Sequence, residues 1–326
     1  MKIRVFPYFA CLGLALLVCL PAAAQPGANY PSRPIRMIVP NAPGSSTDTL
    51  SRILAARLGE AFGQQVIVDN RAGAGGVIGM ELAKSASPDG YTLVSATTSA
   101  STVAVLLQKK PTYDPVNDYV HVMQVAVTPN VLVTNLALPV KTVRELIDYC
   151  KARSGRVNMA TAGSGSQSHF AGAYFLQAAS FESLHVPYKG GGASVAAVMA
   201  GESQWTLTPA PAIMSLVRAG RLRALGHSLP QRSPLLADMP AIAETVPGFD
   251  YSGWQGFMMP KGTPKPIVDK VRAVVIKALN TPEMKETLAQ QATEVVTGTP
   301  EEFRNLVRDS LKKNAQVVKA VGLKIE

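Results

Sequence analysis

The sequence contains two stretches of the same design, MIVPNAPGSSTD at residues 37–48 and NMATAGSGSQSH at residues 158–169. Each stretch begins with a short apolar run that predicts a buried strand and continues through a turn rich in glycine and serine. Each turn then leads into a segment with the pattern of a helix. A strand, a turn and a helix form the repeating unit of α/β folds, and one copy lies in each half of the chain.

Short apolar runs alternate with helical patterns over residues 35–228, which predicts βαβ crossovers and mostly parallel sheets. The clearest helix is expected at residues 46–62, with its apolar residues on one face and Gly63 at its end. The C-terminal third is predicted to be helical, and its last helix begins with a capping box at Thr299–Glu302. A chain of this length usually forms two domains.

The N-terminus is typical of a secretory signal peptide over residues 1–24. Its apolar run, residues 9–20, is too short to span a bilayer, and the Ala22–Ala24 segment fits a cleavage signal. A lipoprotein would need a small residue before Cys19, which follows a valine instead. We therefore expect an exported, periplasmic protein whose mature chain begins near Gln25.

The formal net charge of +10 is spread along the chain without basic–aromatic clusters, so no nucleic-acid partner is expected. The positive charge suits an anionic small molecule, although a solvated basic surface would give the same composition. Cys11 and Cys19 leave with the signal peptide, so no disulfide is expected. The remaining cysteine, Cys150, fits a packed position on a helix.

The two glycine- and serine-rich turns carry the chemistry of an anion site. A helix N-terminus offers unpaired backbone N–H groups and the positive end of the helix dipole, while glycine allows close approach. For one such turn taken alone, simple helix capping is the better explanation, but a matched pair favours binding. Asp48 is expected to orient its loop, because its charge would repel an anion. The expected ligand-binding residues are Asn41, Pro43, Gly44, Ser45, Ser46, Thr47, Asp48, Thr97, Thr98, Gly163, Ser164, Gly165, Ser166, Gln167, Ser168, His169 and Thr208.

Other chemistries have weaker signals. The glycines of residues 73–79 resemble a dinucleotide fingerprint, but the third glycine is one residue late and the turn follows the second strand. The four histidines lack metal-ligand spacing, and no Gly-x-Ser-x-Gly elbow exists. Only Asp48 and His169 are ionisable within the two turns. We therefore expect no catalytic residue, no metal and no cofactor, while an enzyme on a similar two-domain frame is the rival hypothesis.

Many ordered motifs make the sequence resemble the Bug family, the periplasmic substrate-binding proteins of tripartite tricarboxylate transporters. The motifs span nearly the whole mature chain and include residues 30–35, 42–48, 70–76, 87–93, 113–115, 129–133, 185–190, 220–225, 260–264 and 298–303. The resemblance implies a type II periplasmic-binding-protein fold, in which two α/β domains joined by a hinge close over a ligand. It also implies that both turns grip a carboxylate, with ordered waters bridging the rest.

The resemblance further places domain 1 at residues 25–128 and 252–326 and domain 2 at residues 129–251. It implies membrane permease subunits as partners, and we expect a monomer. A role as a ligand sensor for a signalling partner is the alternative to a role in transport. The sequence departs from the family at Asn41, where phenylalanine is usual, at Ser45, where glycine is usual, and at Thr208–Pro209, where many members have Phe-Asp. Mono-, di- and tricarboxylates, aliphatic or aromatic, therefore all stay open as ligands.

Overall fold

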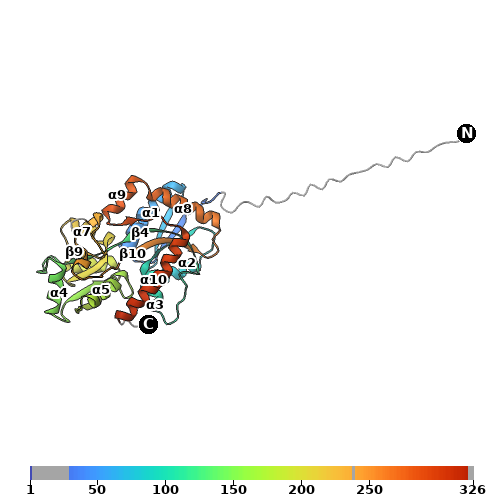
Figure 1. Ribbon diagram of the computed structural model, residues 1–326. Helices are drawn as coiled ribbons and strands as arrows, with labels where there is room; N and C mark the ends of the chain where they lie inside the picture. The colour runs from blue at the N-terminus through green and yellow to red at the C-terminus, as the bar shows by residue number, and fades with distance from the viewer. Residues whose placement is uncertain (2–28, 237–238, 322–326) are drawn as a thin grey trace.

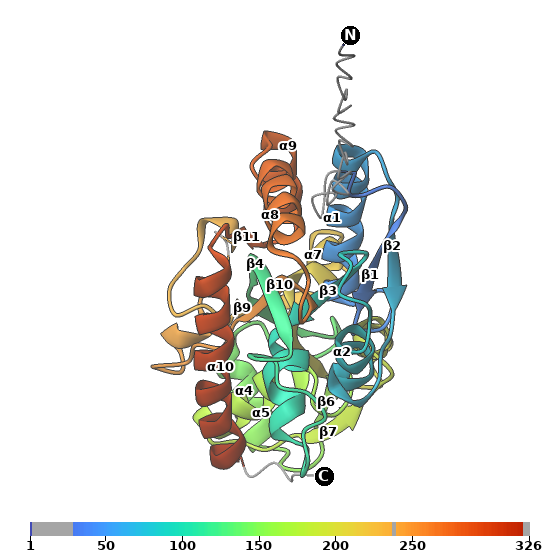
Figure 2. The ribbon, with the colours of Figure 1, turned by 90° about the vertical axis from the view of Figure 1, so that its right-hand side faces the viewer.

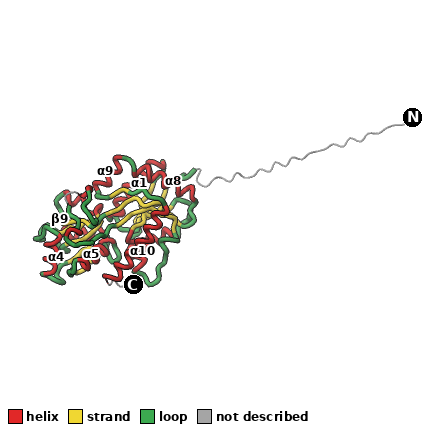
Figure 3. Tube along the Cα trace, viewed as in Figure 1, coloured by secondary structure: helices red, strands yellow, loops and turns green. Residues whose placement is uncertain are grey.

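The computed structural model describes residue 1, residues 29–236 and residues 239–321. The predicted signal peptide, apart from Met1, lies outside the described residues. Strands form two groups, each covered by helices, and the two groups lie side by side in one elongated molecule (Figures 1 and 3). Within the described part, no helix is both long and apolar enough to cross a membrane.

The first sheet has six strands in the order β11-β4-β10-β3-β1-β2. Its strands are β1 (Ile35–Val39), β2 (Val66–Asn70), β3 (Thr92–Thr97), β4 (Tyr119–Thr128), β10 (Gly253–Pro260) and β11 (Glu294–Val295). β1 pairs with β2 and β3 in parallel, whereas β10 runs antiparallel to both β3 and β4. β11 pairs antiparallel with β4 at the edge.

The second sheet has five strands in the order β7-β6-β8-β5-β9. Its strands are β5 (Asn130–Thr134), β6 (Asn158–Thr161), β7 (Leu184–Pro187), β8 (Trp205–Pro209) and β9 (Arg223–His227). β6 is parallel to β7 and β8, whereas β5 is antiparallel to β8 and β9. Both sheets are therefore mixed, and the prediction of mostly parallel sheets was wrong. The antiparallel pairs arise where β4, β5 and β10 carry the chain between the two sheets.

Helices cover both faces of each sheet. They are α1 (Ser46–Phe62), α2 (Val77–Lys84), α3 (Ala104–Leu106), α4 (Val143–Lys151), α5 (Gln167–Ala178), α6 (Gly191–Ala200), α7 (Met214–Arg218), α8 (Lys265–Leu279), α9 (Pro282–Gln290) and α10 (Pro300–Val321). Short helical turns are η1 (Ala74–Gly76), η2 (Ser99–Val103), η3 (Ala210–Ala212), η4 (Pro234–Leu236) and η5 (Ile242–Glu244). The start of α10 is the predicted capping box, since Thr299 and Glu302 exchange hydrogen bonds of 2.6 and 3.1 Å.

Each sheet has an apolar core on each face. In the first sheet, α1 and α8 pack on one face, and α2 packs on the other together with the first half of α10. In the second sheet, α4 and α5 cover one face, and α6 and α7 cover the other. Cys150 is a free, fully buried residue of the α4 core, as predicted. Burying these faces is the main source of stability, because no disulfide joins the described residues.

The long helix α10 runs along the molecule from the first sheet toward the second (Figure 2). Its Phe303 and Val307 pack in a core of the first sheet, whereas Val317 packs in a core of the second. Asn314, also on α10, accepts a hydrogen bond from the Tyr251 hydroxyl at 3.0 Å and donates one to the Thr102 hydroxyl at 2.8 Å. The helix therefore contacts both halves of the molecule.

The chain passes between the sheets twice, once from β4 into β5 and once on the way from β9 to β10. These crossings lie side by side, because the Asn130 side chain donates a hydrogen bond to the Tyr251 carbonyl at 2.6 Å. All strands of the second sheet come from residues 130–227, and those of the first come from residues 35–128 and 253–295. We propose on this basis that the domains are residues 25–128 with 252–326 and residues 129–251, with the hinge at the crossings.

Candidate functional site

The two predicted turns have the same geometry. Ser45 and Ser166 are the N-cap residues of α1 and α5, and both have φ −73° and ψ 162°. Each hydroxyl accepts the backbone N–H three residues later, from Asp48 and His169 respectively, at 3.2 Å. The capping interpretation therefore holds at both turns. Capping of this kind occupies only the third amide of each helix and leaves the first two amides free for another acceptor.

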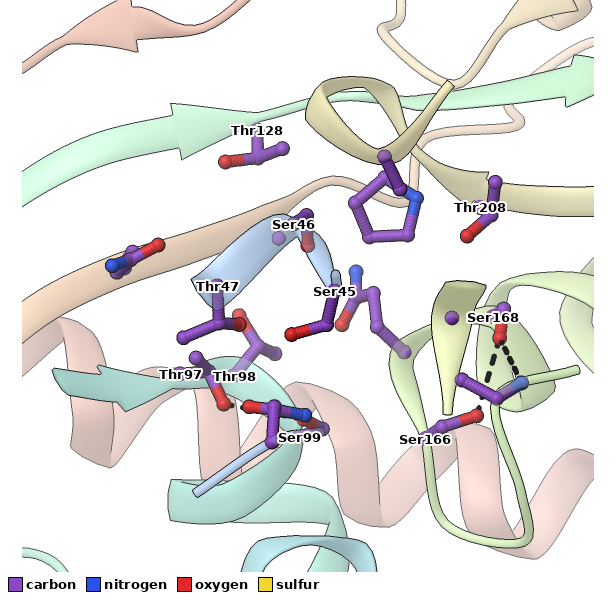
Figure 4. A pocket seen from close by; sticks show the side chains of 18 of the residues that line it. Ser45, Ser46, Thr47, Thr97, Thr98, Ser99, Thr128, Ser166, Ser168 and Thr208 are labelled. Carbon is purple, nitrogen blue, oxygen red and sulfur yellow. Dashed lines mark hydrogen bonds between the residues drawn. The ribbon is translucent and has the colours of Figure 1, made fainter. Parts of the chain in front are cut away.

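A cavity lies between the two sheets, where these turns face each other; we call it the inner cavity. It has an empty volume of about 570 Å³, including its open side. Its lining residues are Asn41, Ser45, Ser46, Thr47, Thr97, Thr98, Ser99, Thr128, Ala162, Ser166, Gln167, Ser168, Gly191, Thr208, Pro209, Ala212, Gly253, Trp254 and Gln255. In Figure 4 the labelled residues of the first turn, Ser45, Ser46 and Thr47, lie on one side and those of the second turn, Ser166 and Ser168, lie on the other.

The first amides of both helices border this cavity. Ser46 and Thr47 open α1, Gln167 and Ser168 open α5, and all four residues line the inner cavity. Their backbone N–H groups have no hydrogen-bond partner within the described ranges. Two helix dipoles therefore direct their positive ends at one space. This arrangement can stabilise a carboxylate without any basic side chain.

The wall of the inner cavity is polar but uncharged. Ten of its residues carry hydroxyl groups and three carry amides, and none of the described lining residues is ionisable. The Ser166 and Ser168 hydroxyls lie 3.2 Å apart, and Ser168 also accepts the N–H of Ala162 at 2.9 Å. By contrast, the hydroxyls of Ser46 and Thr208 form no hydrogen bond with the rest of the described chain. These free hydroxyls can donate to a bound anion or accept from a polar ligand.

A second, larger cavity, which we call the outer groove, adjoins the inner one. The two share Asn41, Ser45, Ala162, Ser166 and Gly191. The outer groove has an empty volume of about 1020 Å³ and is bordered by residues 72–76 on one side and 188–191 on the other. The glycine-rich stretch that resembles a dinucleotide fingerprint thus forms part of this groove. The predicted site residues Gly163 and Ser164 line the outer groove and not the inner cavity.

The structure places Pro43, Gly44, Asp48, Gly165 and His169 outside both cavities. The Asp48 carboxylate accepts hydrogen bonds from Gly44 N–H at 2.9 Å, Arg52 Nε at 3.0 Å and Asn70 Nδ2 at 3.0 Å. Burial alone would raise the pKa of Asp48, but the hydrogen bonds from Arg52, Gly44 and Asn70 outweigh it and hold this pKa below its ordinary value. Asp48 thus stabilises the conformation of the first turn without lining either cavity.

His169 has the corresponding position in the second turn, and it also lines neither cavity. Its Nδ1 accepts the backbone N–H of Gly165 at 3.1 Å, and its ring stacks on His185 with the ring centres 4.0 Å apart. His185 Nε2 in turn lies 2.7 Å from the Thr161 hydroxyl. Burial, helped by the neighbouring His185, lowers the pKa of His169 to about 4, so the ring is neutral at pH 7.

Several lining residues were absent from the sequence prediction. They are Ser99, Thr128, Ala162, Gly191, Pro209, Ala212, Gly253, Trp254 and Gln255. Gln255 is 3% exposed and donates to the Ser95 and Ser51 hydroxyls at 2.7 and 3.2 Å, which fixes its amide at the cavity floor. Trp254 and Pro209 add apolar surface. Thr97, Thr98 and Thr208, which were predicted, do line the cavity. No cluster of metal-ligating side chains occurs within residues 29–236 and 239–321.

Two mixed α/β sheets with a polar cavity between them are the architecture of periplasmic solute-binding proteins, and comparisons with known proteins point to the same class. The model of the tripartite tricarboxylate transporter family receptor matches residues 50–323. The chain is 37% identical to protein BugT of Bordetella pertussis over 320 residues, which cover 97% of this chain and 98% of BugT. The chain therefore belongs to the tripartite tricarboxylate transporter receptor family, which includes the Bug proteins.

Solved structures support the same fold. The chain is similar to the R. palustris protein Rpa4515, solved with adipate, with 31% identity and a TM-score of 0.87 over 90% of this chain and 98% of that one. It is also similar to MatC from Rhodopseudomonas palustris, solved with bound malate, with 28% identity and a TM-score of 0.83 over 89% and 100% of the two chains. These relatives are solute-binding receptors, and the family implies a periplasmic location.

Proposed function

We propose that this protein captures a small carboxylic acid in the inner cavity and delivers it to the membrane subunits of a tripartite transporter. The observation that carries the proposal is the set of four unpaired amides, at Ser46, Thr47, Gln167 and Ser168, which come from two helices in different domains. One carboxylate has enough lone pairs to accept hydrogen bonds from both helix ends at once. Binding therefore draws the two domains together.

The conformation described here is closed, which supports this assignment. A β-carbon built on Gly190 would lie 2.7 Å from the Ala42 side chain, and one on Gly75 would lie 3.6 Å from the Gly165 carbonyl oxygen. Both pairs join one domain to the other across the cleft. A ligand that contacts both domains favours this closed arrangement by its differential affinity for the closed state.

The cavity also supports a receptor that binds without catalysis. General acid–base chemistry needs an ionisable group within hydrogen-bond reach of the ligand. The described wall offers hydroxyls and amides instead, and both Asp48 and His169 lie behind the turns. We therefore propose that the bound acid leaves the protein unchanged. Export through the predicted signal peptide and a monomeric state complete the proposal.

Isothermal titration calorimetry of the mature chain tests the ligand class. The titrants are acetate, succinate, malate, adipate, citrate and benzoate, with glucose and putrescine as neutral and cationic controls. We expect one acid or more to bind with 1:1 stoichiometry, and NMR of the mixture to show the acid unchanged. At a hundred times its Kd, that acid should also stabilise the fold by about 2.7 kcal/mol. Binding of glucose or putrescine alone would overturn the proposal, as would the appearance of a product.

A further inference from the structure

Two side-chain amides in the inner cavity carry buried atoms that have no hydrogen-bond partner among the described residues. Both amide atoms of Gln167, Oε1 and Nε2, are buried without a hydrogen bond, and so is Oδ1 of Asn41. Both residues line the inner cavity, Asn41 from the turn before α1 and Gln167 from the first residue of α5. A buried polar atom without a partner destabilises a protein by about 1–3 kcal/mol. A ligand that supplies the missing partners removes this penalty.

The surroundings of Gln167 keep its amide unpaired. A β-carbon built on Gly253 would lie 2.9 Å from Gln167 Nε2, so the amide packs against the bare backbone of β10 in the opposite domain. The neighbouring Ser166 and Ser168 hydroxyls bond to each other and to backbone N–H groups instead. The Gln167 side-chain amide therefore lies beside the free backbone amides at the helix ends, and it forms no hydrogen bond with another described residue.

We propose that Gln167 and Asn41 form a specificity subsite for an uncharged polar substituent of the bound acid. The inference rests on the proposed function, because the helix-end amides hold the carboxylate. The unpaired atoms include acceptors, Oε1 and Oδ1, and a donor, Nε2. A carboxylate only accepts hydrogen bonds, so it cannot satisfy the two acceptors. A hydroxyl group both donates and accepts, and a primary amide does the same.

The chemical class that fits is a hydroxy acid or an amide-bearing acid. An ammonium group on the ligand is a poor fit, because no described lining residue carries a negative charge to pair with it. An unsubstituted acid of the same length leaves both side-chain amides buried and unpaired. Sites that hydrogen-bond a ligand hydroxyl discriminate strongly against the analogue that lacks it for this reason.

Matched pairs of acids test the subsite on the mature chain. Calorimetric titrations compare butyrate with 2- and 3-hydroxybutyrate, succinate with malate, and 2-hydroxybutyrate with 2-aminobutyrate. We expect a hydroxy acid of at least one pair to bind about tenfold or more tightly than its unsubstituted partner. We also expect the amino acid to bind more weakly than the hydroxy acid.

Two variants assign the discrimination to the proposed residues. Gln167→Met keeps the length of the side chain but removes its hydrogen-bonding groups, and Asn41→Leu does the same across the cavity. In each variant the affinity ratio within the discriminating pair should fall toward one, because the hydroxy acid loses the partner that favours it over the unsubstituted acid. Gln177→Met is the control, since Gln177 is an exposed glutamine on the same helix, α5.

The outcomes separate this inference from the proposed function. If acids bind but every pair has equal affinities, the subsite is refuted while the carboxylate receptor stands. If the ratio persists in both Gln167→Met and Asn41→Leu, other residues read the substituent and the inference is wrong. If no acid binds in any form, both the inference and the proposed function fail. Circular dichroism spectra that match the wild type show that each variant is folded.

Discussion

The Asp48 carboxylate accepts the backbone N–H of Gly44 at 2.9 Å. On the other side of the cleft, His169 Nδ1 accepts the N–H of Gly165 at 3.1 Å. In each turn, the side chain of the residue four positions after the glycine thus accepts a hydrogen bond from the N–H of that glycine. The glycine directly precedes the N-cap residue. A ligand is left with the first two amides of each helix. Asp48 and His169 therefore influence ligand binding indirectly, because they fix the conformation of the two turns.

Replacing Asp48 tests this role. Asp48→Ala leaves the Gly44 amide, Arg52 and Asn70 without their shared acceptor, and Asp48 is only 4% exposed. We expect a loss of about 2–4 kcal/mol in the free energy of unfolding together with weaker ligand binding. Asp269→Ala, at an exposed ion pair with Lys265, is the control and should change stability by less than about 0.5 kcal/mol. Urea titrations and calorimetry measure both quantities. Unchanged affinity in a destabilised Asp48→Ala protein would contradict the role in binding.

Two serines at the helix ends should respond differently to truncation. Ser166 caps α5, so Ser166→Ala should reduce both stability and affinity, the former by about 0.5–2 kcal/mol. The Ser46 hydroxyl has no partner in the described chain, so Ser46→Ala should leave stability unchanged and weaken binding by about 0.5–1.5 kcal/mol. Thermal unfolding of the ligand-free proteins and titrations on each variant check both. Equal losses of stability in the two variants would show that the Ser46 hydroxyl supports the fold.

Much of the fold follows from local patterns. The helix predicted at residues 46–62 is α1, and the predicted alternation of strands and helices begins with β1, which ends directly before Pro40. These segments have clear periodicity and end at glycine or proline, which fix the boundaries locally. β4 at Tyr119–Thr128 was not predicted. Its role as a crossing strand, paired with β10 more than a hundred residues later, depends on long-range contacts that no local pattern encodes.

The candidate site was predictable in part for a related reason. The turns were found because a strand, glycine, serine and a helix start are contiguous in sequence. The backbone amides of the turns that face the cavity are determined by the direction of side chains one helical turn later, such as Asp48. Composition does not give the direction of those side chains. Thr128 and Gln255 reach the cavity because β4 and β10 pair beside it. Nothing near these two residues in the sequence indicates a site.

Acid should destabilise the protein through His169. Burial lowers its pKa to about 4, whereas an unfolded histidine has a pKa of 6.5. The unfolded chain thus binds the proton first, so stability is complete above pH 6.5 and declines as the pH falls from 6.5 to about 4. One such group contributes a slope of up to about 1.4 kcal/mol per pH unit. Urea titrations at several pH values measure the slope.

His169→Asn isolates this contribution. The asparagine side-chain oxygen can replace Nδ1 as the acceptor of the Gly165 amide, and it does not titrate. We expect the variant to retain ligand affinity at pH 7 and to lose part of the slope between pH 6.5 and 4. His169→Ala also removes the acceptor, so it should bind more weakly at every pH. If His169→Asn keeps the full slope, the acid sensitivity arises at other groups, such as the buried His121.

The sharpest prediction concerns Gly191, the first residue of α6. A β-carbon there would lie in van der Waals contact with the opposite domain, 3.6 Å from the Cα of Ser45, so we expect the further carbons of a larger side chain to crowd the closed cleft. Its φ is not in the left-handed region, and leucine favours a helix over glycine by up to about 1 kcal/mol. Gly191→Leu should therefore fold normally but hold the domains apart, and ligand affinity should fall about a hundredfold or more.

Ala193→Leu is the matched control, because Ala193 lies two residues further along α6 and is exposed. We expect this control to bind and close like the wild type. Small-angle scattering with saturating ligand should reduce the radius of gyration of the wild type and of Ala193→Leu, but not of Gly191→Leu. Thermal unfolding of the ligand-free proteins should give similar melting temperatures for all three, because the contacts that a β-carbon at Gly191 would make within 4 Å are with Ser45 of the opposite domain. A Gly191→Leu protein that binds with wild-type affinity would show that the ligand does not need the closed cleft.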